Sequence, residues 1–261
     1  MATIGWVPAG PVAPPIATDA LRRQLTVGAP LFTTVSYLRA GEADGARVIM
    51  VHGTPGSATA WADYLLSPPP GIELVALDRP GFGRSGPVDA VIRLADQAAA
   101  VSALMRHDER PVVLVGHSLG GAVVARVAAD QPQRVGAIVL LAASLDPALE
   151  TIHPVQHLGA WPPMKALLPR AIRNANAELM ALKVELQALE RALARITGDV
   201  VIVHGTDDDL VPVANVPFAQ SRLCAARSVR VVLLEGRNHF LPWNSEAAVR
   251  DAIRNALEPS R

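Results

Sequence analysis

The amino-acid sequence predicts an α/β fold: a doubly wound, mostly parallel sheet flanked by helices, with a small helical cap inserted late in the chain. Three observations support this prediction. Short apolar runs rich in β-branched residues recur without alternating with polar residues, as strands buried on both faces of a sheet do. Ala- and Leu-rich stretches with helical spacing separate these runs. One long segment between two of the runs has no strand pattern.

Strands that alternate with helices imply βαβ crossovers and a sheet of about six to eight strands. The buried strands are expected at residues 47–51, 72–77, 111–115, 135–141, 200–203 and 229–234. Residues 31–38 alternate more clearly and are a candidate for an antiparallel edge strand. The helices are expected at residues 91–105, 119–129, 213–226 and 245–257.

The segment without a strand, residues 146–198, is longer than the roughly dozen residues that a crossover needs. Its first half is rich in proline, and its second half carries an apolar stripe from Leu179 to Ile196 in steps of three and four residues. The stripe favours a helix packed over the protein's own sheet, because a coiled-coil seam is expected to continue over more heptads. The segment is therefore predicted to be a helical cap that ends at Gly198.

Composition excludes several classes of protein. The 261 residues are 50% hydrophobic and carry 24 Lys and Arg against 24 Asp and Glu, so neither nucleic acid nor an anionic membrane surface is an expected partner. No apolar run is long enough to predict a membrane span. The single cysteine excludes a disulfide framework and a cysteine-based zinc site.

Outside the predicted cap, the chain divides into two predicted parts. Residues 31–145 and 199–261 are predicted to form the α/β core, and residues 1–30 an N-terminal arm. The start of this arm is rich in proline and has neither a basic leader nor an apolar run. We therefore expect an irregular arm rather than a secretory signal, and a cytoplasmic protein.

The stretch Gly116-His-Ser-Leu-Gly-Gly121 lies between a predicted strand and a predicted helix. In this setting G-x-S-x-G is the pattern of a nucleophile elbow, a sharp turn that exposes a serine hydroxyl. The flanking glycines are needed because a β-carbon there would clash with the neighbouring helix or strand. The helix N-terminus adds partial positive charge where an oxyanion forms. Ser118 is therefore predicted to be a nucleophile.

A serine nucleophile needs a base, and the base needs an acid that orients it. Three acids, Asp207 to Asp209, follow a late strand, and their side chains point in different directions, so one at most faces the base. No histidine or carboxylate cluster at ligand spacing accompanies them, so no metal is expected. His239 follows the last strand and completes the order serine, acid, histidine. The histidines at positions 52, 117 and 204, each at a strand end beside glycine, are expected to brace loops.

An oxyanion hole needs two donors. One is the backbone N–H of Leu119, directly after the serine. The other is expected from the turn at residues 52–56, where Pro55 has no N–H and the N–H of Thr54 remains. A second glycine-rich stretch, residues 81–86, fits G-x-G-x-x-G but is followed by proline rather than by an opening helix. No nucleotide cofactor is therefore expected.

Together these motifs resemble the α/β-hydrolase superfamily over residues 31–257. The stretches that carry the resemblance are residues 52–56, 78–85, 116–121, 205–212 and 238–239. In similar proteins the acid falls three residues after the glycine and four before the proline of Gly205-Thr-Asp-Asp-Asp-Leu-Val-Pro212, which implies Asp208.

The resemblance bears on the branch of the superfamily as well. The Gly-His-Ser at the nucleophile is common in carboxylesterases and small lipases, and the turn at residues 52–56 looks like that of prolyl-aminopeptidase-type members. Those members often carry Gly-Gly-Ser at the nucleophile, and C–C bond hydrolases often carry Gly-Asn-Ser. Haloalkane dehalogenases and epoxide hydrolases use an aspartate nucleophile, so Ser118 argues against both.

The resemblance implies a serine hydrolase that cleaves a carboxylic ester or a related acyl compound with water, through an acyl-enzyme and without cofactor or metal. Its triad would be Ser118, Asp208 and His239. Three apolar residues, two of them in the cap, are expected to line the substrate pocket: Trp161, Leu182 and Leu210.

Several alternatives use the same site. An aminopeptidase would need an acidic anchor for the substrate amine, for which Glu150 and Glu178 are candidates. A C–C bond or lactone hydrolase, an acyltransferase and a perhydrolase would share the triad. A non-catalytic binding protein on a hydrolase fold is the alternative outside enzymes.

Overall fold

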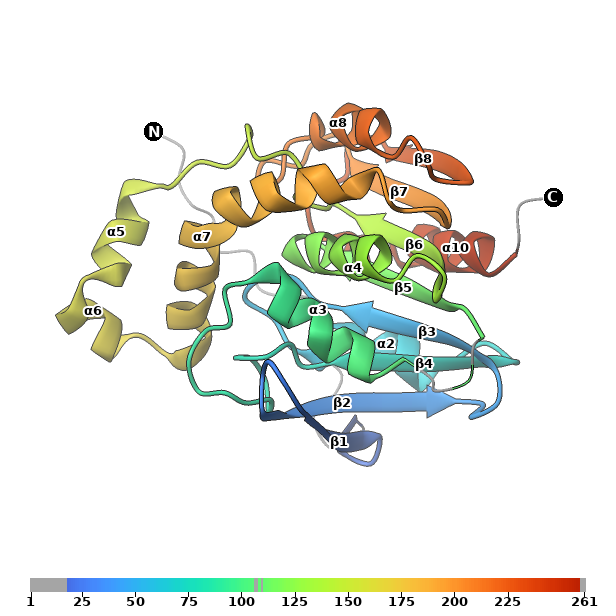
Figure 1. Ribbon diagram of the computed structural model, residues 1–261, viewed down its shortest axis with the longest axis horizontal. Helices are drawn as coiled ribbons and strands as arrows, with labels where there is room; N and C mark the ends of the chain where they lie inside the picture. Colours follow the sequence, from blue (N-terminus) through green and yellow to red (C-terminus); the bar gives the residue numbers. More distant parts are fainter. Residues whose placement is uncertain (1–17, 106–107, 109, 259–261) are drawn as a thin grey trace.

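The computed structural model describes residues 18–105, 108 and 110–258. These residues form one sheet with the strand order β1-β2-β4-β3-β5-β6-β7-β8, flanked by helices on both faces (Figure 1). The strands are β1 (Arg22–Val27), β2 (Thr33–Gly41), β3 (Ala46–Val51), β4 (Ile72–Leu77), β5 (Val112–His117), β6 (Val135–Leu141), β7 (Asp199–Gly205) and β8 (Ser228–Leu234). β3 to β8 are parallel, whereas β1 and β2 are antiparallel to their neighbours. The predicted fold class is confirmed.

The six parallel strands lie where the apolar runs predict them, to within two residues at each end. The antiparallel end of the sheet differs from the prediction, because β1 pairs outside β2 and takes the edge position. β1 falls inside residues 1–30, which the sequence assigns to an arm; of that arm, residues 1–17 lie outside the described residues. The strand is hard to predict because four of its six residues are polar and only Val27 is buried.

Helices cover both faces because successive strand residues point to opposite sides. Alternate residues of β3 illustrate this: Ile49 and Val51 belong to one core cluster, and Val48 and Met50 to the other. In Figure 1, α3 and α4 lie in front of the sheet, and α2 and α10 lie behind it. The helices outside the cap are η1 (Ala58–Trp61), α2 (Ala62–Leu66), α3 (Leu94–Ala103), α4 (Leu119–Asp130), α8 (Asn215–Arg222), α9 (Leu241–Asn244) and α10 (Glu246–Leu257).

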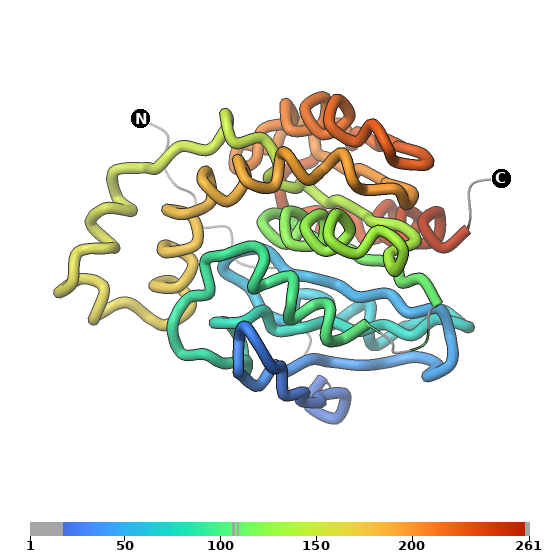
Figure 2. Tube along the Cα trace, in the orientation of Figure 1, coloured from blue at the N-terminus to red at the C-terminus, as the bar shows by residue number. Residues whose placement is uncertain are grey.

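The segment between β6 and β7 holds three helices: α5 (Pro154–Ala160), α6 (Pro162–Leu167) and α7 (Arg170–Leu193). Two prolines begin α5 and α6, because proline is tolerated in a first helical turn. Neither short helix has a buried residue, and both project from the body of the protein before α7 returns to it (Figures 1 and 2). Among the described residues, no helix is both long and apolar enough to cross a membrane.

The second half of α7 is part of the protein core. Leu182, Leu186 and Leu189 join the cluster that contains residues of α3 and α4. From Leu182 onward the apolar stripe therefore packs over the protein's own sheet, as its spacing predicts, whereas Leu179 at its start is 36% exposed. The first half of α7 extends from this anchored half toward α5 and α6 (Figure 2).

Two substitutions in α7 test this division. Leu186 is fully buried and Val184 is 66% exposed, two positions apart on one helix. We expect Leu186→Ala to lower the free energy of unfolding by about 2–5 kcal/mol, because it leaves a cavity in the core. Val184→Ala is expected to change it by about 0.5 kcal/mol or less. Urea denaturation measures both, and equal effects would contradict a core position for this half of the helix.

Candidate active site

Ser118 occupies the turn between β5 and α4 with a strained backbone, φ 56° and ψ −127°. A non-glycine residue in this conformation costs about 1–3 kcal/mol and persists only where its surroundings fix it. Here its N–H donates to the carbonyl of Leu141 at 2.9 Å. A β-carbon on Gly116 would collide with the backbone of Gly120, and one on Gly120 would collide with the carbonyl of Val51. The turn therefore needs both glycines, as the sequence predicts.

Asp208 and His239 are in direct contact. His239 Nδ1 donates to Asp208 Oδ2 at 2.8 Å, and both residues are buried. The backbone N–H groups of Leu210 and Val211 donate to the other oxygen, Oδ1, at 3.0 and 2.8 Å. Burial by itself raises the pKa of Asp208, but the hydrogen bonds from His239 and the backbone outweigh it and hold the pKa below its ordinary value. A carboxylate at Nδ1 leaves Nε2 as the basic nitrogen of His239.

The structure also separates the three consecutive acids. Asp207 and Asp209 are exposed, whereas Asp208 points into the protein. Asp207 accepts a hydrogen bond from the neighbouring Thr206 hydroxyl at 3.0 Å. Asp208 is therefore the acid that meets His239, the same residue that the resemblance implies.

His117, directly before Ser118, holds the loop that carries His239. Its Nε2 donates to the carbonyl of His239 at 2.9 Å, and the two rings lie 4.8 Å apart between centroids. Burial, with repulsion from His239, lowers the pKa of His117 to about 3, so its imidazole is neutral at pH 7. Because a carbonyl only accepts, the proton of this imidazole lies on Nε2. This bond ties the end of β5 to the loop after β8.

The turn at residues 52–56 lies against the serine. A β-carbon on Gly53 would stand 2.9 Å from the β-carbon of Ser118. The hydroxyl of Thr54 donates to Glu178 Oε2 at 2.6 Å, so its backbone N–H is the group that remains for a substrate oxygen. Leu119 opens α4, and the first N–H groups of a helix have no partner within it. The two expected oxyanion donors therefore belong to two segments that both adjoin Ser118, the start of α4 and the turn at residues 52–56.

A buried ion pair behind this turn is the feature that the sequence did not reveal. Arg79 follows β4 and Glu178 lies in α7, and their side chains are joined at 2.7 Å between Nη1 and Oε1 and at 3.0 Å between Nη2 and Oε2. Gln97 also donates to Glu178 Oε1 at 2.6 Å. With Thr54 on Oε2, four hydrogen bonds occupy the carboxylate, so Glu178 is not free to anchor the amine of a peptide substrate.

The three residues predicted to line the pocket lie in different surroundings. Leu182 is buried in the core cluster, whereas Trp161 and Leu210 are 56% and 65% exposed. Core packing accounts for Leu182 without a substrate. A pocket role for Trp161 and Leu210 stays a prediction.

The glycine-rich stretch at residues 81–86 folds around a carboxylate of the same chain. Asp78 accepts hydrogen bonds from the backbone N–H groups of Ala58 and Arg84 at 2.7 and 2.9 Å. Arg22 of β1 forms an ion pair with it at 2.8 Å. A β-carbon on Gly83 would collide with this carboxylate. Gly83 therefore serves close packing around Asp78.

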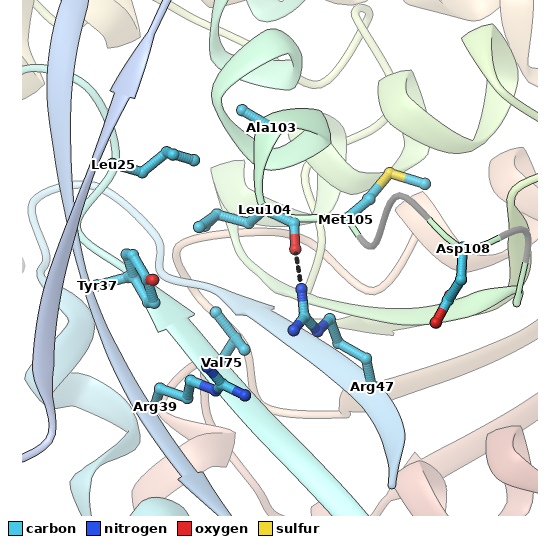
Figure 3. Close-up of a pocket in the computed structure, with 9 residues that line it drawn as sticks. All are labelled: Leu25, Tyr37, Arg39, Arg47, Val75, Ala103, Leu104, Met105 and Asp108. Atoms are coloured by element: carbon cyan, nitrogen blue, oxygen red, sulfur yellow. Dashed lines mark hydrogen bonds between the residues drawn. The ribbon is translucent and has the colours of Figure 1, made fainter. Parts of the chain in front are cut away.

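A cavity of about 320 Å³ lies apart from these residues, between the first four strands and the end of α3 (Figure 3). Its two arginines, Arg39 and Arg47, both form ion pairs with the buried Glu73. Arg47 also donates to the carbonyl of Leu104 at 2.7 Å, the bond drawn in Figure 3. None of the predicted site residues lines this cavity.

Comparisons with known proteins show the family and the fold of this chain. A model of the alpha/beta hydrolase family matches residues 48–252. A haloalkane dehalogenase of Mesorhizobium japonicum is 35% identical over 122 residues, which are 46% of this chain and 38% of the relative. Lipase LipV of Mycobacterium tuberculosis is 39% identical over 115 residues, 42% of this chain and 41% of the relative. The chain thus spans less than half the length of these two relatives.

The fold is similar to that of a solved 2-hydroxy-6-oxo-6-phenylhexa-2,4-dienoate hydrolase from Rhodococcus sp. strain RHA1. The TM-score is 0.71 at 19% sequence identity, over 90% of this chain and 98% of that one. At this identity the similarity concerns the fold alone.

The contact between Asp208 and His239 predicts a large difference between neighbouring acids. We expect Asp208→Asn to slow the reaction of Ser118 with a fluorophosphonate by about 10³- to 10⁴-fold, because the imidazole loses its working tautomer. Asp207→Asn, its matched control, is expected to react within about twofold of the unmodified protein, since exposed positions away from the site contribute little. Labelling rates measure both, and a fully reactive Asp208→Asn would contradict the assignment of the acid.

The low pKa of His117 predicts a pH dependence of stability. Between pH 6.5 and about 3 the unfolded chain protonates this histidine and the folded protein does not. Stability is therefore present in full above pH 6.5 and falls as the pH falls, by about 1.4 kcal/mol per pH unit from this group. We expect His117→Gln to have a correspondingly shallower loss between pH 6 and 4 in urea denaturation. The exposed His153→Gln is the control, and equal slopes for His117→Gln and the unmodified protein would refute the prediction.

Proposed function

The chain belongs to the alpha/beta hydrolase family, and from this membership and the geometry of the site we propose that it is a serine hydrolase acting on a carboxylic ester or a related small acyl compound. The observation that carries the proposal is the pair of features around Ser118. Its strained turn presents the hydroxyl at the end of β5, and an Asp208–His239 pair joined at 2.8 Å stands on the loops after β7 and β8.

The proposed reaction has two halves. Ser118 Oγ attacks the acyl carbon while His239 Nε2 takes its proton, and Asp208 stabilises the imidazolium that forms. The backbone N–H groups of Leu119 and Thr54 receive the oxyanion. When the bond to the alcohol breaks, the alcohol leaves with the proton from His239. Water then attacks the acyl-enzyme with His239 as base, and the acid and free Ser118 are released.

The site favours ester cleavage over dehalogenation and over an aminopeptidase. A serine nucleophile differs from the aspartate expected of haloalkane dehalogenases, although one of them is among the relatives. The ion pair between Glu178 and Arg79 removes one of the two candidate amine anchors of an aminopeptidase. The other candidate, Glu150, is partly buried, and this burial raises its pKa, which disfavours the ionised form that an anchor needs.

A labelling experiment tests the proposal without a guess about substrate. We expect a fluorophosphonate to label the protein covalently on Ser118 and to leave a folded Ser118→Ala variant unlabelled. Intact-mass spectrometry with peptide mapping measures the site, and circular dichroism shows that the variant is folded. A folded, unmodified protein that stays unlabelled would argue against an activated serine and raise the non-catalytic alternative.

A substrate panel then separates the remaining reactions. Short and long p-nitrophenyl esters, a lactone, aminoacyl amides and a C–C-cleavable vinylogous diketone are compared by kcat/KM. We expect the esters to lead the panel, and added alcohol to divert little of the acyl group. Preferential turnover of the amides, of the diketone or of the alcohol acceptor would move the assignment to a peptidase, a C–C hydrolase or an acyltransferase.

A further inference from the structure

The ion pair between Arg79 and Glu178 is buried, and the free-energy cost of burying two charges calls for an explanation. Arg79 is 0% exposed and Glu178 is 2% exposed, and the two positions are 99 residues apart in the chain. Removing two charges from water is expensive, and apolar residues of similar size often stabilise a fold as well as a buried ion pair does. Stability alone is therefore a weak explanation for this pair. Its other hydrogen bonds indicate what it holds.

Arg79 donates hydrogen bonds to the backbone of the turn at residues 52–56. Its Nε donates to the carbonyl of His52 at 2.9 Å, and its Nη2 donates to the carbonyl of Gly53 at 2.9 Å. The backbone N–H of Arg79 donates to His52 Nε2 at 3.0 Å, which places the ring proton of His52 on Nδ1. That Nδ1 donates to the same Gly53 carbonyl at 2.7 Å. Two donors therefore fix one carbonyl oxygen.

Fixing the Gly53 carbonyl fixes the N–H of Thr54. The peptide bond between Gly53 and Thr54 is trans, and the cis bond of this turn lies one residue later, between Thr54 and Pro55. In a planar trans peptide the carbonyl and the following N–H point in opposite directions. A cation at the carbonyl also polarises the peptide, which makes its N–H a better donor. This N–H is the second donor of the proposed oxyanion hole.

Glu178 completes the arrangement from the cap side. It neutralises Arg79 and holds two of the guanidinium nitrogens, and it accepts the hydroxyl proton of Thr54 at 2.6 Å. Thr54 is thus held both through its peptide bond and through its side chain. We propose that Glu178 of α7 is a positioning residue that, through Arg79 and the Thr54 hydroxyl, aims the Thr54 N–H at the substrate oxyanion. This inference rests on the proposed function.

The attachment of α7 to the protein does not depend on Glu178. Asn174 donates to the carbonyl of Gly81 at 2.8 Å, and Arg170 donates to the carbonyl of Pro87 at 2.9 Å. The leucine stripe anchors the second half of the helix. A change at Glu178 is therefore expected to act on the turn while α7 stays in place.

The test compares two acidic residues of α7. Glu178→Gln keeps the size of the side chain and removes its charge. Glu185→Gln is the matched control, because Glu185 accepts the N–H of Leu94 at 2.9 Å and contacts α3 rather than the turn. Fluorophosphonate labelling rates, together with kcat and KM for an ester that the protein cleaves, are the readouts. We expect Glu178→Gln to lower the labelling rate and kcat by about tenfold or more with KM within about twofold, and Glu185→Gln to match the unmodified protein.

A double-mutant cycle shows whether Glu178 acts through the turn. Thr54→Val removes the hydroxyl and keeps the backbone N–H, so we expect a smaller loss of rate, about threefold. The Thr54→Val/Glu178→Gln double variant is expected to react no more slowly than Glu178→Gln alone, because both substitutions remove the same restraint. Losses that multiply would overturn the proposal, since the two residues would then act independently.

Stability is separated from rate by a further variant. Arg79→Met/Glu178→Leu removes both charges, so we expect it to recover the melting temperature that Glu178→Gln loses, while its labelling rate stays low. Recovery of both together, or a Glu178→Gln that labels at the unmodified rate, would overturn the proposal. A folded, unmodified protein that does not label at all would instead overturn the proposed function, and this inference with it.

Discussion

The close approach of α4 to the ends of β3 and β5 is the constraint on which the candidate site depends. Ser118 keeps a strained backbone only because Gly116 and Gly120 let the helix and the strands come into contact. The absent side chain of Gly120 faces the carbonyl groups of Val51 and His52. The contact that strains the serine therefore also sets the start of the turn that carries Thr54. One packing requirement places both the predicted nucleophile and an expected oxyanion donor.

The carboxyl ends of the parallel strands bring buried polar groups to one edge of the sheet, and each of these groups needs a partner. Three histidine rings donate hydrogen bonds to carbonyls there: His52 to Gly53, His117 to His239, and His204 to Val211. Burial lowers the pKa of all three, so they stay neutral and donate one proton each. His239 differs in its partner, because its Nδ1 donates to the carboxylate of Asp208 and not to a carbonyl.

The helix α7 joins the cap to this edge in two ways. Its leucine stripe makes its second half part of the core, and its polar residues hold the loop after β4 and the turn before Pro55. The predicted cap helix therefore contacts both the core and the turn that carries Thr54. Of the helices in the described part of the chain, only α5 and α6 have no buried residue and stand apart from the core.

The parallel strands and the turn at Ser118 can be predicted from the sequence, because local patterns determine them. The apolar runs locate the parallel strands, and the glycines around Ser118 identify the turn, since both depend on residues close in the chain. The resemblance singled out Asp208, and burial shows why: its neighbours on both sides point to solvent. β1 escaped prediction because its polar residues become a strand only by pairing with β2. The ion pair between Arg79 and Glu178 was decided by tertiary structure alone, because no local pattern joins two charges 99 residues apart, and only burial makes each the other's necessary partner.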